Sequence, residues 1–195
     1  MPPSIKRSLR FTMEKMKISN SSWKMSLNQQ LNQLTTKLDE LPRVAVVGIG
    51  NTLRNDDGAG ILVARELTRR EHLAGMHHVL VIQAGHAPEN VTGELREFDP
   101  DLILLVDAAE FRDVPGAICW VPIQAIEGMS ASTHSLPLSM LARYLTLELH
   151  CDVALIGIQP KSNDVGEVIS VEVQAAVNEI VNEMCDACLI IKPAY

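Results

Sequence analysis

Apolar runs that alternate with helical patterns constrain the fold of this chain more than any other feature. From Arg43 onward, short apolar runs such as DLILLVDA (101–108) are separated by segments of helical periodicity such as AGILVARELTRR (59–70). Parallel strands need long crossover connections, so this alternation favours a parallel sheet with both faces covered. The sequence predicts an α/β fold, a three-layer α/β/α arrangement around a mainly parallel, twisted sheet.

The same patterns give approximate bounds for the elements. Strands are expected at 43–49, 77–83, 101–108, 116–122 and 152–160, with a short strand or edge element at 93–98. No apolar stretch approaches the roughly 18–20 residues that span a bilayer, and the N-terminus lacks the apolar region of a secretory signal. The four cysteines are not in a disulfide-dense arrangement, so we expect a reduced, cytoplasmic protein without a membrane span.

The first 42 residues differ in composition from the rest. They hold seven basic and three acidic side chains, so residues 43–195 carry a net charge of −11 within the total of −7. Residues 1–25 lack periodicity and are expected to be disordered. A leucine stripe predicts an amphipathic helix at 26–41, which docks on the body or, less favoured, meets a partner helix. We expect a basic arm at 1–42 and a main domain at 43–195, whose acidity argues against nucleic acid as the partner.

The turn VVGIGNTLRNDDGAG (46–60) begins like a nucleotide site and then departs from one. Gly48 and Gly50 are followed by Leu53, so the third glycine of a dinucleotide fingerprint is missing. The chain also lacks the Gly-Lys-Ser/Thr of a phosphate loop and the G-x-S-x-G of a nucleophile elbow. Asp56 and Asp57 would repel a phosphate, so this turn offers carboxylates instead.

Two further polar residues are expected at the same edge of the sheet. Asp107 ends a buried strand, and His134 lies in the loop that opens the next helix. Loops at the carboxyl ends of parallel strands converge, and two carboxylates with one imidazole can hold a divalent metal while leaving positions open. The alternatives are structural: Asp-Asp-Gly is also a common turn or cap, and a histidine near a helix start is often a capping or packing residue.

These residues resemble the hydrogenase maturation proteases, which trim the large subunits of nickel–iron hydrogenases. The similarity is carried by VVGIGNTLRNDDGAG, GHAPEN, LLVDAAE, PGAI, STHSLPL and LIGIQPKS. It is closest to the branch that serves formate-hydrogenlyase-type and related archaeal enzymes. It covers about residues 43–185, which makes 43–195 the protease domain and leaves the N-terminal arm outside the resemblance. The resemblance implies that the α/β/α fold is phosphorylase/hydrolase-like.

The resemblance implies a site and a reaction. Asp57, Asp107 and His134 match the family's metal-binding and catalytic residues, and Asp56 is then a turn or supporting group. The implied enzyme is an aspartyl-type endopeptidase, a hydrolase that removes the C-terminal extension from the nickel-loaded large-subunit precursor of a nickel–iron hydrogenase. No permanent cofactor is expected, because the substrate supplies Ni²⁺, although other divalent ions can occupy the site. Either carboxylate could act as general base, or the metal could lower the pKa of a water.

Two other functions fit the same residues. One is a non-proteolytic, nickel-recognising chaperone or docking module, and the other is a related-fold protease with an unmetallated substrate. Among the remaining residues, Cys185 and Cys188 are expected to pack in a helix rather than bind metal. Gln159 and Pro160 are expected to shape the wall of the site, and His86 lines the site or lies on a surface loop.

Overall fold

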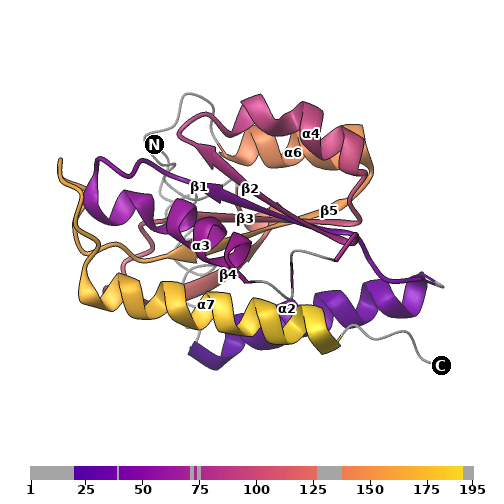
Figure 1. Ribbon diagram of the computed structural model, residues 1–195, viewed down its shortest axis with the longest axis horizontal. Coiled ribbons are helices and arrows are strands. Elements are labelled where there is room, and N and C mark those ends of the chain that lie inside the picture. The colour runs from indigo at the N-terminus through magenta and orange to yellow at the C-terminus, as the bar shows by residue number, and fades with distance from the viewer. Residues whose placement is uncertain (1–19, 39, 71–72, 74–75, 127–137, 191–195) are drawn as a thin grey trace, which may run out of the picture.

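The computed structural model describes residues 20–38, 40–70, 73, 76–126 and 138–190. Its centre is a five-stranded sheet with the strand order β2-β1-β3-β5-β4. Helices cover both faces of this sheet, so the chain forms three layers (Figure 1). The predicted three-layer α/β/α fold is therefore confirmed.

The strands explain why their sequences are so apolar. They are β1 (Val44–Ile49), β2 (Val79–Gly85), β3 (Leu102–Ala108), β4 (Ile118–Pro122) and β5 (Asp152–Ile158). All neighbours are parallel except the edge strand β4, which pairs with β5 in the antiparallel direction. Every residue of β1 and β3 is buried, as expected for central strands that helices cover on both sides.

The helices divide between the two faces. One face carries α2 (Asn20–Lys37), α3 (Ala59–Thr68) and α7 (Val171–Ile190), and the other carries α4 (Thr92–Phe98), α5 (Ile123–Ile126) and α6 (Leu138–Leu149). Each set packs with the sheet as a separate apolar cluster. Within the described residues, no helix combines the length and the apolar character that crossing a bilayer requires.

The segment 93–98 is a helix, so the expected strand or edge element there is wrong. Leu95 is buried and Phe98 is half-buried, whereas the charged residues between and around them are exposed. That spacing of three places both apolar side chains on one side of a helix. Asp99 ends the helix with φ +51°, and its N–H donates to the carbonyl of Leu95 at 3.0 Å.

The helix expected at 26–41 is present as α2 and docks on the body, but its bounds differ. It begins at Asn20 and ends at Lys37, because the buried stripe starts earlier, with Trp23, and continues through Leu27, Leu31 and Leu34. Lys24 adds ion pairs to Glu179 and Glu183 of α7, both at 3.3 Å. Of the stretch expected to be disordered, residues 1–19 lie outside the described part of the chain, and residues 20–25 are helical.

Candidate active site at the carboxyl edge of the sheet

The order in which the chain adds strands to the sheet reverses between β1 and β3. The chain leaves β1 through α3 to reach β2 on one side, and then returns past β1 to β3 on the other side. In open α/β sheets, ligands bind at the carboxyl ends of the strands at such a switch point. The turn after β1 carries Asp57, and Asp107 lies at the carboxyl end of β3, so both predicted carboxylates belong to this edge.

Glycines let the turn after β1 fold tightly against its own strand. Gly50 has φ +136°, and a Cβ there would collide with the carbonyl of Asp57. A Cβ on Gly60 would collide with the carbonyl of Val106 in β3. The pattern that looks like a nucleotide fingerprint therefore serves close backbone approach, and the N–H of Asn51 donates to the carbonyl of Asp57 at 3.1 Å.

Asp57 has a buried carboxylate oxygen for which the described part of the chain supplies no donor. The residue is 3% exposed and lies in η1 (Asn55–Gly58), the short 3-10 helix after the turn. Its main-chain N–H donates to the carbonyl of Arg54 at 3.0 Å, but its Oδ2 has no hydrogen-bond partner among the described residues. Burying a carboxylate oxygen without a hydrogen bond or a counter-ion costs free energy. This oxygen is therefore a candidate to bind a ligand.

Asp107 is buried at the end of β3, where it pairs in register with Gly157 of β5. Because β3 contacts η1, Asp57 and Asp107 come from elements that touch at one edge of the sheet. His134, the third predicted ligand, lies in 127–137, outside the described residues. Within the described residues, no three His, Cys, Asp or Glu side chains form a group that could hold a metal.

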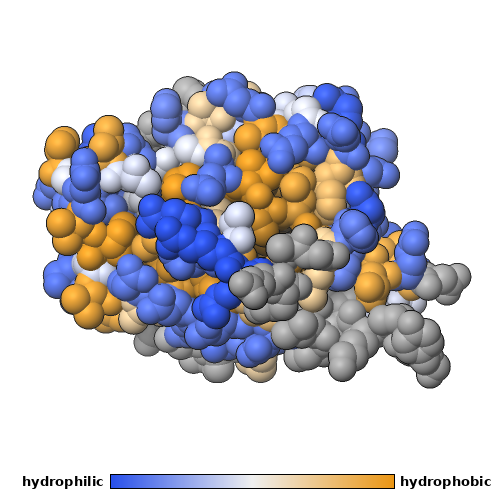
Figure 2. Space-filling model, viewed as in Figure 1, coloured by the Kyte–Doolittle hydropathy of each residue, from blue (hydrophilic) through white to orange (hydrophobic). Residues whose placement is uncertain are grey.

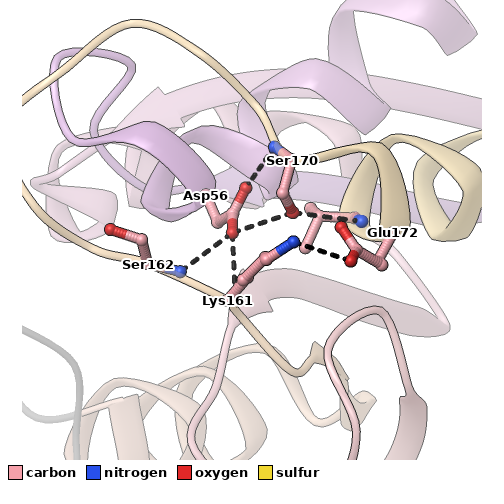
Figure 3. Close-up of polar contacts among 6 residues, drawn as sticks. Asp56, Lys161, Ser162, Ser170 and Glu172 are labelled. Carbon is pink, nitrogen blue, oxygen red and sulfur yellow. Dashed lines mark hydrogen bonds and ion pairs between the residues drawn. The ribbon is translucent and has the colours of Figure 1, made fainter.

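Asp56 has a different environment from its neighbour Asp57, because both oxygens of its carboxylate accept hydrogen bonds (Figure 3). Oδ2 accepts from the main-chain N–H groups of Lys161 (2.8 Å) and Ser162 (3.1 Å). Ser170 donates its N–H to Oδ1 at 2.7 Å and its hydroxyl to Oδ2 at 3.0 Å. Asp56 therefore pins residues 161–170, which we call the clasp loop, to the turn that carries Asp57.

We expect Asp56→Asn to lower the free energy of unfolding by about 2–4 kcal/mol. The amide would turn an NH₂ group toward donors and leave buried N–H groups unsatisfied. Urea denaturation measures the change. The matched control is Asp164→Asn, an exposed carboxylate in the same loop that accepts from Ser162 Oγ at 3.0 Å, where the change should stay within about 0.5 kcal/mol. An Asp56→Asn variant as stable as wild type would contradict the role of the clasp.

Ser170 and Asn55 were missed by sequence reasoning. Asn55 has φ +43° and accepts the N–H of Val168 at 3.2 Å through its Oδ1. Ser170 also accepts the N–H of Val173 at 3.4 Å, in the first turn of α7. A serine directly before a helical run is a capping signal in the sequence, but its second bond, to Asp56, is a long-range contact without a local signature.

Gln159 holds the loop that follows β3, on the other side of the site. Its side chain is 3% exposed, and its Oε1 accepts from the N–H groups of Phe111 (3.0 Å) and Asp113 (3.2 Å). Its own N–H donates to the carbonyl of Ala117 at 2.8 Å. Gln159 therefore fixes the loop after β3, and its expected role in the wall of the site stays a prediction. The His86 side chain, in contrast, is exposed next to the end of β2.

The cysteine side chains that the structure describes are buried. Cys185 is buried among the apolar residues of α7, and burial raises the pKa of its thiol. The Cys188 side chain lies outside the described residues. Burial also raises the pKa of Cys119, in β4, to about 12, so this thiol stays protonated and is a poor nucleophile or ligand.

Comparisons with known proteins point to a single family. Residues 61–187 match the HycI family model, described as hydrogenase maturation protease. The hydrogenase 3 maturation protease of Escherichia coli K12 is 35% identical over 113 residues, which are 57% of this chain and 69% of that protein.

Solved structures agree in fold. A crystal structure of a NiFe hydrogenase maturation protease, HycI from Thermococcus kodakarensis, is similar with a TM-score of 0.67 and 33% identity, covering 75% of this chain and 92% of that one. The solution structure of the endopeptidase HycI from Escherichia coli has a TM-score of 0.62 and 31% identity, covering 71% of this chain and 86% of that one.

Proposed function

The chain belongs to the hydrogenase maturation protease family and is a peptide hydrolase, and we propose that it removes the C-terminal extension from the nickel-loaded large-subunit precursor of a nickel–iron hydrogenase. The observation that carries this proposal is the buried Oδ2 of Asp57, which has no donor among the described residues. It lies at the sheet edge where α/β folds bind ligands. An oxygen held in this state is suited to receive a cation.

We propose that this cation is the Ni²⁺ that the precursor already holds, so the ion enters as part of the substrate. Asp57 and Asp107 would supply carboxylate oxygens and His134 an imidazole nitrogen, a donor set suited to a divalent metal with open positions. The net charge of −11 on residues 43–195 also favours a cationic ligand. Trimming would then depend on the nickel state of the precursor.

Hydrolysis of the peptide bond also needs an activated water. A carboxylate at hydrogen-bond distance can take a proton from water as general base. Asp57 and Asp107 are the two predicted carboxylates buried at this edge of the sheet, whereas the Asp56 carboxylate accepts hydrogen bonds from the clasp loop. We therefore assign the acid–base step to this pair and exclude Asp56 from it, since its lone pairs are committed to the clasp loop.

Mass measurement of the precursor tests the proposal. The purified chain is incubated with nickel-loaded precursor and, in parallel, with nickel-free precursor. We expect loss of a C-terminal peptide from the nickel-loaded form only. An unchanged mass together with a stable complex would instead indicate a nickel-recognising chaperone. Equal trimming of both forms would indicate a protease that does not use the metal.

A further inference from the structure

Four large apolar side chains are exposed beside the candidate site. Leu53 is 59% exposed, Val165 85%, Val168 76% and Val171 83%. Leu53 lies on the turn after β1, two of the valines lie in the clasp loop, and Val171 opens α7. We call this set the rim patch. Figure 2 shows hydrophobic surface at this end of the molecule, on the left of the view, where the clasp loop and the turn after β1 lie in Figure 1.

Main-chain hydrogen bonds fix the rim patch in place. The N–H of Gly166 donates to the carbonyl of Leu53 at 2.9 Å, and the N–H of Asn55 donates to the carbonyl of Gly166 at 2.7 Å. Val168 is tied through its N–H to Asn55 Oδ1, and Val171 follows Ser170, which binds Asp56. These valines are therefore held on an ordered backbone, so a partner that binds them need not order the loop first.

The rim patch has the size and surroundings of an interaction surface. The exposed surfaces of these four side chains add up to roughly a few hundred Å², and apolar surface of that extent on a monomer is often functional. Charged groups border it: Asp164 and Glu167 are exposed in the same loop, while Lys161 pairs with Glu172 at 2.8 Å. Arg54 also lies at this border and donates to the carbonyl of Asn163 at 2.9 Å. The acidic side chains Asp164, Glu167 and Glu172 thus outnumber the basic Arg54 and Lys161, which suits an apolar segment with a basic residue beside it.

We propose that the rim patch docks an apolar segment of the large-subunit precursor that lies next to the scissile bond. The inference rests on the proposed function. It adds a surface that recognises the polypeptide of the precursor, in addition to the site that recognises its metal ion. Leu53 is only four residues before Asp57 on the same turn. The clasp loop is bonded to that turn through the N–H of Gly166 and the carbonyl of Leu53, so the rim patch is within reach of a polypeptide that presents its metal to Asp57.

The double variant Val165→Asn/Val168→Asn tests the docking surface. Both side chains are exposed, so the fold and its stability should be unchanged. We expect the KM for trimming of nickel-loaded precursor to rise about tenfold or more with kcat unchanged, because apolar contact made equally before and during the reaction is lost. The matched control is Met140→Asn/Leu147→Asn on α6, at positions 59% and 64% exposed, which should trim like wild type.

Binding measurements separate this inference from the proposed function. In one outcome, wild type binds the precursor without trimming it and the rim variant binds at least tenfold more weakly. That result would support the docking surface and overturn the proposed protease activity. Trimming and binding by the rim variant at wild-type KM and Kd would overturn the docking surface alone. A fall in native mass of the rim variant with unchanged trimming would overturn it too, by assigning the patch to contacts between copies of the chain.

Discussion

Asp57→Asn is expected to slow trimming of the nickel-loaded precursor at least about 100-fold while leaving the protein as stable as wild type or more stable. The variant replaces a carboxylate by a neutral amide of the same shape. In the free protein, Oδ2 of Asp57 is buried without a donor among the described residues, so removing the charge removes a desolvation cost. During the reaction, the same change removes a cation ligand and a candidate base.

The measurement pairs trimming rates with urea denaturation of the same samples. Asp56→Asn is the matched control, because it makes the same chemical change one residue away. That variant should lose stability first, since the Asp56 carboxylate accepts four hydrogen bonds from the clasp loop. Normal trimming by Asp57→Asn would remove Asp57 from the site. A large loss of stability in this variant would show that its carboxylate has a structural role.

The division of labour between these aspartates could not be predicted from local sequence. Both sit in one Asp-Asp-Gly turn, and turn chemistry suits either of them. What separates them is the arrival of residues 161–170, more than a hundred positions further along the chain, with donors aimed at Asp56. The resemblance to a known family singled out Asp57, whereas the residues alone left both open.

The fold was more accessible to sequence reasoning than the site. Runs such as VAVVGI and LILLV are apolar without interruption, which is typical of central parallel strands, and β1 and β3 are indeed buried throughout. The errors fell where the signal is short. Segment 93–98 has only two large apolar residues, Leu95 and Phe98, from which to judge the hydrophobic periodicity. Six residues with two apolar positions are compatible with either a short strand or a short helix.

The start of α2 was missed for a related reason. Residues 20–25 read as part of a polar arm, because Trp23 is the only large apolar side chain there apart from Met25. Trp23 lies four residues before Leu27 and so extends the leucine stripe by one turn. A single residue at the right spacing marks the N-terminal end of α2. Its burial depends on packing in the tertiary structure, which the local sequence does not show.

Trp23→Ala is expected to lower the free energy of unfolding by about 3–5 kcal/mol, the usual cost of truncating a buried aromatic side chain. Trp23 is fully buried and belongs to the apolar cluster that joins α2, α3 and α7 with the sheet. Its Nε1 also donates to Glu179 Oε1 at 3.4 Å. Marginal stability makes such a loss a large fraction of the whole.

Urea denaturation followed by circular dichroism measures this loss, with Met25→Ala on the same helix as control. Met25 is 64% exposed, so its truncation should change the free energy of unfolding by no more than about 0.5 kcal/mol. Hydrogen exchange distinguishes the two ways in which Trp23→Ala could act. If α2 is integral to the core, exchange quickens in α7 and β4 as well as in α2, and the single unfolding transition moves to lower urea. Faster exchange confined to α2, with the main transition unmoved, would show instead that the body is stable without this helix.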